Sequence, residues 1–111
     1  MYKLVFFVPL DHAEAVKQAL FDSGAGWYDR YDSCSWQTPG TGQFRPLAGS
    51  DPYLGTEGRI EHVPELRVEM VCRDEVVRSA VDALIGVHPY EEPAYEIYRV
   101  YTADDLPSTL P

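Results

Sequence analysis

This chain of 111 residues has few cysteines, few basic residues and no long apolar run. Its two cysteines, Cys34 and Cys72, form neither a disulfide framework nor a CxxC pair, so we expect two buried thiols without a redox role. Against 9 basic residues stand 18 acidic ones, which gives a formal net charge of −9. Such a chain repels the phosphates of nucleic acids and of anionic membranes, and we expect neither as a partner.

The longest early apolar run, residues 4–10, is much shorter than the roughly 18 residues that a membrane-spanning helix needs. The N-terminus also lacks the polar flank and the small-residue cleavage site of a signal peptide, so we expect a cytoplasmic protein. With 45% hydrophobic and 24% charged residues, the composition is that of one globular domain. We place this domain at residues 1–102 and an extended tail at 103–111.

Hydrophobic periodicity predicts an alternation of strands and helices. Residues 2–8 form a solid apolar run that indicates a buried strand, and residues 12–23 carry an apolar stripe at helical spacing. Asp11 is the expected N-cap of this helix, and Gly24 is the expected left-handed residue after it. Alternating residues at 28–37 predict a second strand.

Glycine and proline dominate the middle of the chain. Residues 38–58 are so rich in both that we predict a long loop, and loops of this length are often functional. A short extra strand at 59–63 is expected to end at Pro64. The alternation at 65–72 then predicts a strand whose even-numbered residues face the core, while Glu65 and the other odd-numbered residues face outward.

The pattern is completed by a second helix at 74–85, which we expect to end at Gly86. A last strand follows at 94–101, with Ile97 expected in the core. This order predicts an α+β fold, a ferredoxin-like βαββαβ sandwich with an extra short hairpin strand and a long Gly/Pro-rich loop. Two helices cover only one face of such a sheet. We therefore expect a second subunit on the other face, in a homo-oligomer.

Groups that bind ligands or metal ions gather between the second helix and the last strand, at His88, Tyr90, Glu91 and Glu92. Imidazole and carboxylates together form a candidate site for a divalent metal, with His88, Glu91 and Glu92 as its ligands. The alternative is a structural turn. Two flanking prolines make the segment rigid, and the helix dipole favours a histidine at the C-terminus of a helix.

Four further candidates for ligand contact lie outside this motif. Arg45 is the one cation at 38–58 and is a candidate partner for an anionic ligand, with Phe44 beside it. Cys34 and Ser35 are the other two candidates, but a nucleophilic role for either needs a histidine as base. The glycine-rich stretch has no Walker lysine, so no P-loop is predicted.

Two stretches of this chain also resemble a known family. They are Tyr31 with Cys34-Ser35-Trp36, Gly40-Thr41-Gly42, Phe44, Pro46, Gly49, Pro52, Gly55 and Gly58, and then His88-Pro89-Tyr90-Glu91-Glu92-Pro93-Ala94-Tyr95 with Ile97 and Tyr98. Together they resemble the insert domain of YqfO-type Nif-three-like proteins, with Glu96 in place of an aspartate. The resemblance spans residues 2–101. It implies a stand-alone version of that domain, a fold similar to the CutA and PII proteins, and a trimer in preference to a dimer.

These observations lead to one main functional expectation and two alternatives. We expect a non-enzymatic regulatory or assembly module that holds a small ligand or a divalent metal between loop 38–58 and the His88 turn. The loop is also a candidate contact for a protein partner. One alternative is an accessory or remnant of a metal-dependent hydrolase in which His88, Glu91 and Cys34 converge. The other is a purely structural oligomerisation domain.

Overall fold

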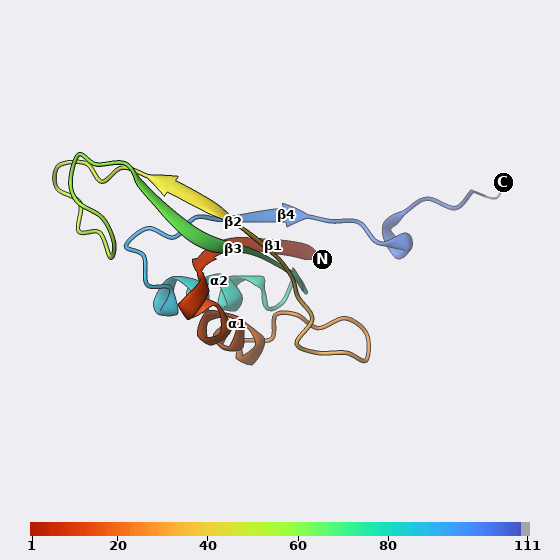
Figure 1. Ribbon diagram of the computed structural model, residues 1–111. Coiled ribbons are helices and arrows are strands. Elements are labelled where there is room, and N and C mark those ends of the chain that lie inside the picture. Colours follow the sequence, from red (N-terminus) through yellow and green to blue (C-terminus); the bar gives the residue numbers. More distant parts are fainter. Residues whose placement is uncertain (110–111) are drawn as a thin grey trace.

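The computed structural model describes residues 1–109, and residues 110 and 111 of the predicted tail lie outside this part. Four strands form one antiparallel sheet in the order β2-β3-β1-β4, and two helices cover one of its faces (Figure 1). The predicted α+β, ferredoxin-like fold is confirmed. Its elements are β1 (Tyr2–Pro9), α1 (Ala13–Asp22), β2 (Trp36–Phe44), β3 (Glu61–Cys72), α2 (Val77–Val87) and β4 (Tyr95–Arg99), with short 3₁₀ turns at Leu10–His12 and Ala103–Asp105.

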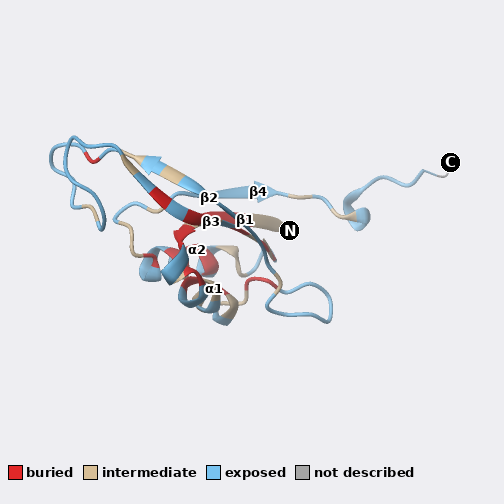
Figure 2. Ribbon diagram, in the orientation of Figure 1, coloured by how far each residue is buried: buried red, intermediate tan, exposed pale blue. Residues whose placement is uncertain are grey.

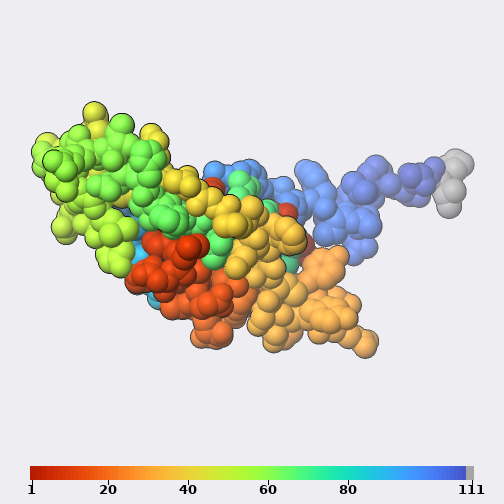
Figure 3. All heavy atoms as spheres, in the orientation of Figure 1, coloured from red at the N-terminus to blue at the C-terminus, as the bar shows by residue number. Residues whose placement is uncertain are grey.

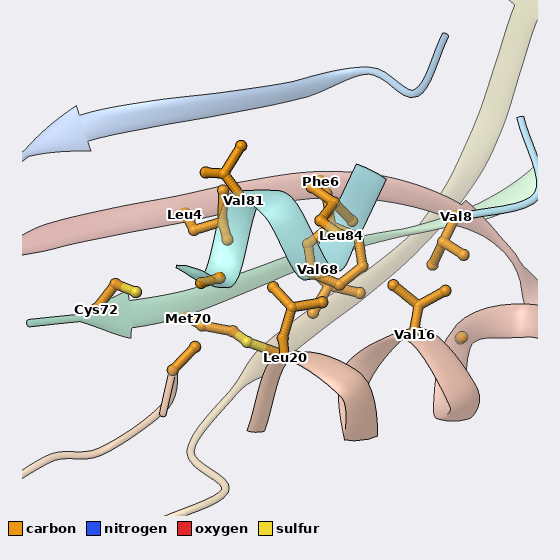
Figure 4. Packing of buried hydrophobic residues seen from close by; sticks show 13 residues of the cluster. Leu4, Phe6, Val8, Val16, Leu20, Val68, Met70, Cys72, Val81 and Leu84 are labelled. Carbon is orange, nitrogen blue, oxygen red and sulfur yellow. The ribbon is translucent and has the colours of Figure 1, made fainter. Parts of the chain in front are cut away.

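The core lies between the two central strands and the helices (Figure 4). Leu4, Phe6 and Val8 alternate along β1, point to the helices and are fully buried. Complete burial of a side chain of this size contributes about 1.5–3 kcal/mol. Val68, Met70 and Cys72 of β3 join them, and the partly buried Leu66 packs against the cluster, so the predicted inner face of residues 65–72 is observed. The helices add the apolar stripes Ala13, Val16, Leu20, Ala80, Val81 and Leu84.

The helix ends differ from the predicted ones for local reasons. α1 begins at Ala13, so Asp11 lies in the preceding 3₁₀ turn and makes no capping hydrogen bond. Gly24 has the expected positive φ, 103°, after α1. α2 runs past Gly86, and it ends because a residue before proline is confined to the extended region, where His88 has φ −66° and ψ 137°. No helix in the described part of the chain is long and apolar enough to span a membrane.

The strand predicted at 28–37 is not observed in that place. Residues 28–35 form a turn closed by a bridge between Tyr28 and Tyr31. β2 instead starts at Trp36 and runs into the predicted loop, through Pro39. A proline is tolerated there because β2 is an edge strand of the sheet.

β3 is one strand where two were predicted. It continues through Pro64, so residues 59–63 do not form a separate extra strand. β1 pairs with β3 only from Glu65 onward, and the earlier residues of β3 pair with β2 alone. Proline is accepted in a ladder with one partner, and the β2-β3 ribbon extends past the end of β1.

The prediction of Ile97 as a core residue is wrong. Ile97 is 44% exposed, and every residue of β4 is exposed. The buried cluster draws its strand residues from β1 and β3, and the edge strand β4 lies outside it.

The sheet face opposite the helices has no cover within residues 1–109 (Figure 2). Trp36 and Tyr98 are 69% and 45% exposed there. Between them, Glu69 pairs with Lys3 at 3.6 Å and with Arg67 at 3.8 Å. We call these five residues the open face.

The molecule is elongated, with dimensions of 60 × 29 × 24 Å. Residues 45–60 project at one end, and the segment after β4 projects at the other (Figure 3). Both projections leave the body formed by the sheet and the helices.

Candidate ligand-binding site at one end of the sheet

Past the end of β1, three segments border a half-open cavity of about 600 Å³. They are the β2-β3 ribbon, residues 45–60 and residues 88–94. Figure 1 shows the course of these segments, of which the last crosses from α2 toward β4. Small-molecule sites usually have volumes of about 300–1,000 Å³. The cavity is therefore large enough for a small organic ligand.

Residues 45–60 are fixed to the body by side chains. Tyr53 Oη and His12 Nε2 are hydrogen-bonded at 2.8 Å, and the two rings meet edge to face at 5.4 Å. The Asp51 amide donates to Glu91 Oε2 at 3.0 Å, which connects this segment to residues 88–94. These contacts define the cavity wall.

Glu65 and Tyr90 form a hydrogen-bonded pair at the cavity. The Tyr90 hydroxyl donates to Glu65 Oε2 at 2.7 Å, and Glu65 is only 9% exposed. Burial, followed by the interaction with Glu65, raises the pKa of the Tyr90 phenol far above its usual range. The phenol therefore remains a neutral donor at physiological pH.

Gly42 makes room for the Glu65 carboxylate. The two residues lie on neighbouring strands, and a Cβ at position 42 would overlap Glu65 Oε1. Gly40, two residues earlier in the same strand, has no heavy atom within 4 Å of where a Cβ would lie. The glycine requirement on this wall thus belongs to position 42.

His88 supports the cavity from behind. Its Nε2 lies 2.6 Å from the Phe7 carbonyl oxygen, and its Nδ1 accepts the Tyr90 amide at 3.1 Å. A carbonyl can only accept and an amide can only donate, so this network assigns the neutral tautomer with the proton on Nε2. Burial lowers the pKa of His88, while the bond to Phe7 and the charge of Glu65 oppose that shift. The imidazole holds Tyr90 in position and is absent from the cavity lining.

The structure gathers five of the eight candidate residues around the cavity and separates the other three. Phe44, Arg45, Tyr90, Glu91 and Glu92 line it. His88 lies behind the lining. Cys34 and Ser35 lie in a second hollow, near the start of β2, together with Lys3 and Trp36 of the open face.

The three predicted metal ligands are not arranged as a metal site. Within residues 1–109, no group of three or more His, Cys, Asp and Glu side chains is placed to hold a metal ion. His88 already uses both ring nitrogens, and Glu91 accepts a backbone hydrogen bond from residue 51. Binding a metal would require these contacts to break.

Sequence reasoning missed Glu65, Tyr53 and Gly42 as cavity residues. Alternation correctly placed Glu65 on the face away from the helices, where a charged residue is normally solvated. Its burial depends on residues 45–60 and on Tyr90, which are distant in sequence. No pattern in the sequence around Glu65 predicts such a contact.

Comparison with known proteins was made by sequence and by structure. No protein-family model matches the chain. Residues of this chain align with proteins named GTP cyclohydrolase 1 type 2 homolog, at 43% identity over 98 residues in Halalkalibacterium halodurans and 46% over 98 residues in Mycobacterium leprae. In each case the match covers 88% of this chain and 26% of the relative. The chain therefore spans about a quarter of the length of these relatives.

Solved structures complete the assignment. A Bacillus cereus protein related to NIF3 matches with a TM-score of 0.78 and 39% identity, over 91% of this chain and 26% of that one. The chain resembles one segment of NIF3-like proteins. CutA from Xylella fastidiosa matches with a TM-score of 0.66 over 92% of this chain and 85% of CutA. At 22% identity, that match establishes a common fold alone. The family resemblance and the CutA-like fold expected from the sequence are both confirmed.

Proposed function

We propose that this chain is a non-enzymatic module that binds a small organic ligand in the cavity between β2-β3 and residues 88–94. The observation that carries the proposal is the cavity itself, whose lining combines aromatic rings with the buried Glu65 carboxylate. Sites for small molecules have this composition, a mostly apolar lining with few polar groups.

A binding role accords with the state of the reactive groups at the cavity. The His88 imidazole is committed to two backbone partners, and the Tyr90 phenol is held neutral. Neither is poised to exchange a proton near neutral pH. The cyclohydrolase name belongs to relatives about four times longer than the match, and we do not transfer that activity to this chain.

The proposal is tested by a thermal-shift screen with amino acids, amines, nucleotides and divalent metal salts. A ligand at about 100 times its Kd stabilises the folded state by roughly 2.7 kcal/mol, which shifts the midpoint by several degrees. The shift should be lost in Gly42→Ala, which displaces Glu65, and retained in the matched variant Gly40→Ala. A shift of equal size in both variants, or no shift with any compound class, would contradict binding in this cavity.

We further propose that the protein is a homo-oligomer, a trimer in preference to a dimer, joined through the open face. The supporting observation is an uncovered sheet face on which Trp36 and Tyr98 are exposed beside charges of both signs. A face with both signs of charge is complementary to a second copy of itself. Sedimentation velocity measures the oligomeric state directly.

A further inference from the structure

Three aromatic rings surround one corner of the cavity. Phe44 comes from the end of β2, Tyr53 from the 45–60 segment and Tyr90 from the turn after α2. The ring centroid of Tyr90 lies 6.1 Å from that of Phe44 and 6.3 Å from that of Tyr53, with interplanar angles of 52° and 46°. The three rings thus lie close together in the lining of the cavity.

A buried carboxylate lines the same space. Glu65 Oε2 accepts the Tyr90 hydroxyl, whereas Oε1, which has no hydrogen-bond partner within residues 1–109, is open to solvent. Oε1 lies over Gly42, a lining residue. An accessible carboxylate oxygen can accept an N–H from a ligand, and its charge favours a cationic one.

The other charges of the lining have the same sign, with one exception. Glu91 and Glu92 line the cavity with Glu65, and Arg45 is the one cation among the described lining residues. Arg45 is exposed and makes no ion pair with any described residue. A phosphate or another anion would meet three carboxylates here, so the lining disfavours it.

We propose that the cavity binds an organic cation, an alkylammonium or guanidinium compound, with its charged head among Phe44, Tyr53 and Tyr90 and beside Glu65. This inference rests on the proposed function and names the ligand class of the same cavity. Rings of Phe and Tyr attract a cation through their quadrupoles, most strongly where the cation is desolvated. Glu65 Oε1 supplies the opposite charge and accepts an N–H of the ligand, or faces a quaternary head at contact distance.

The experiment compares choline with its neutral isostere 3,3-dimethyl-1-butanol by calorimetry, and adds agmatine as a guanidinium probe. Choline and the isostere have the same shape, so only the charge differs. We expect choline or agmatine to bind at least about tenfold more tightly than the isostere, a factor that corresponds to roughly 1.4 kcal/mol. If neither choline nor agmatine binds more tightly than the isostere, the cationic assignment is overturned and the cavity remains a ligand site. If the cations fail to bind while a neutral or anionic compound shifts the melting midpoint, the inference fails and the proposed function stands. If no compound binds, both fail.

Two carboxylate variants separate a specific contact from bulk charge. Glu65→Gln keeps the shape and the acceptor for Tyr90 but removes the charge, and Glu75→Gln removes an exposed charge that follows the far end of β3. We expect Glu65→Gln to weaken cation binding at least about tenfold and Glu75→Gln to leave it within about twofold. If both variants weaken binding equally, the net charge of the protein is responsible and the proposed contact is excluded.

The ring contribution has its own variant, which also serves if Glu65→Gln does not fold. Phe44→Leu keeps an apolar side chain at the cavity and removes one ring face. We expect this variant to bind choline more weakly than the wild type and to bind the isostere with unchanged affinity. Equal losses for both compounds would show that Phe44 contributes apolar area alone.

Discussion

At the scale of single residues, the cavity depends on a short chain of contacts from Phe7 through His88 and Tyr90 to Glu65. Each contact is a hydrogen bond between a donor and an acceptor, and at least one of the two groups is buried or partly buried. Such networks are worth more when complete than when one member is missing, because the remaining polar group stays buried without a partner. The residues of this chain should therefore respond strongly to small changes.

Gly42→Ala introduces a methyl group into the space of the Glu65 carboxylate. We expect a loss of about 1–3 kcal/mol in the free energy of unfolding, as for other overpacked sites. Gly40→Ala should change it by less than about 0.5 kcal/mol, because nothing lies near that Cβ position. Urea denaturation of both variants measures the difference. Equal losses of unfolding free energy in the two variants would mean that the lower stability comes from a change in strand propensity and not from contact with the Glu65 carboxylate.

His88 makes stability depend on pH in a defined direction. Burial lowers its pKa in the folded protein below the ordinary value of 6.5, so the unfolded chain binds the proton first as pH falls. The contribution of His88 to stability is complete above about pH 6.5 and is lost progressively below it. Thermal midpoints between pH 8 and pH 5 should fall more steeply for the wild type than for His88→Gln. The exposed His62→Gln variant should retain the wild-type slope, and an unchanged slope in His88→Gln would refute this assignment.

At the scale of elements, the segment 45–60 is held mainly through Tyr53 and Asp51. Tyr53→Phe removes the hydrogen bond to His12 and keeps the ring. We expect faster amide hydrogen exchange across residues 46–58, with a loss in unfolding free energy of no more than about 1 kcal/mol because the bond is exposed. Tyr31→Phe, at a side chain that is 71% exposed, is the control and should leave exchange in the segment unchanged. Slow exchange in Tyr53→Phe would show that other contacts order the segment.

The elements differ in how far the sequence alone predicts them. β1, the later part of β3 and both helices carry burial patterns that periodicity recognises, such as the run that contains Leu4 and Phe6. β2 carries none, because every side chain of this edge strand is exposed or half-buried, and its proline and glycines indicate a loop. The cavity was anticipated at residues 88–92 and at Phe44, where reactive groups cluster in sequence. Glu65 and Tyr53 enter it through tertiary contacts, which no periodicity records.

At the scale of the whole molecule, the chain is less compact than a typical domain of the same length. The radius of gyration is 16.4 Å, against about 13 Å for a compact domain of this length. Elongation and the uncovered open face both indicate surface that a second copy can bury. Association in the proposed homo-oligomer would add the apolar contact that Trp36 and Tyr98 lack within one chain.

Trp36→Glu tests the oligomer at its proposed centre. The new carboxylate would lie directly across from Glu69, its cross-strand partner, and would repel it and any facing copy. We expect sedimentation velocity to show a multimer for the wild type and a monomer for this variant. Tyr101→Glu, which changes a residue that is 74% exposed and outside the sheet, should remain multimeric. A monomeric wild type at all concentrations would exclude the homo-oligomer.

We also propose that residues 1–102 are the folding unit. Residues 103–109 are all exposed, and the capping box of their short 3₁₀ turn joins Asp105 to Thr102, the last residue of the proposed unit. A chain truncated after residue 102 should melt within about 2 °C of the full chain, since little buried area is removed. A larger drop in the melting midpoint would assign the segment to the domain.

The position of Pro39 in β2 bears on how the protein behaves in concentrated solution. The outer edge of a sheet has unpaired amides and carbonyls that can form hydrogen bonds with a strand of another molecule. Fibrils grow by repeated pairing of this kind. Pro39 removes one amide near the middle of an otherwise exposed nine-residue edge. Pro39, one of the residues that led the sequence to predict a loop here, thus makes the outer edge of β2 a poor template for amyloid growth.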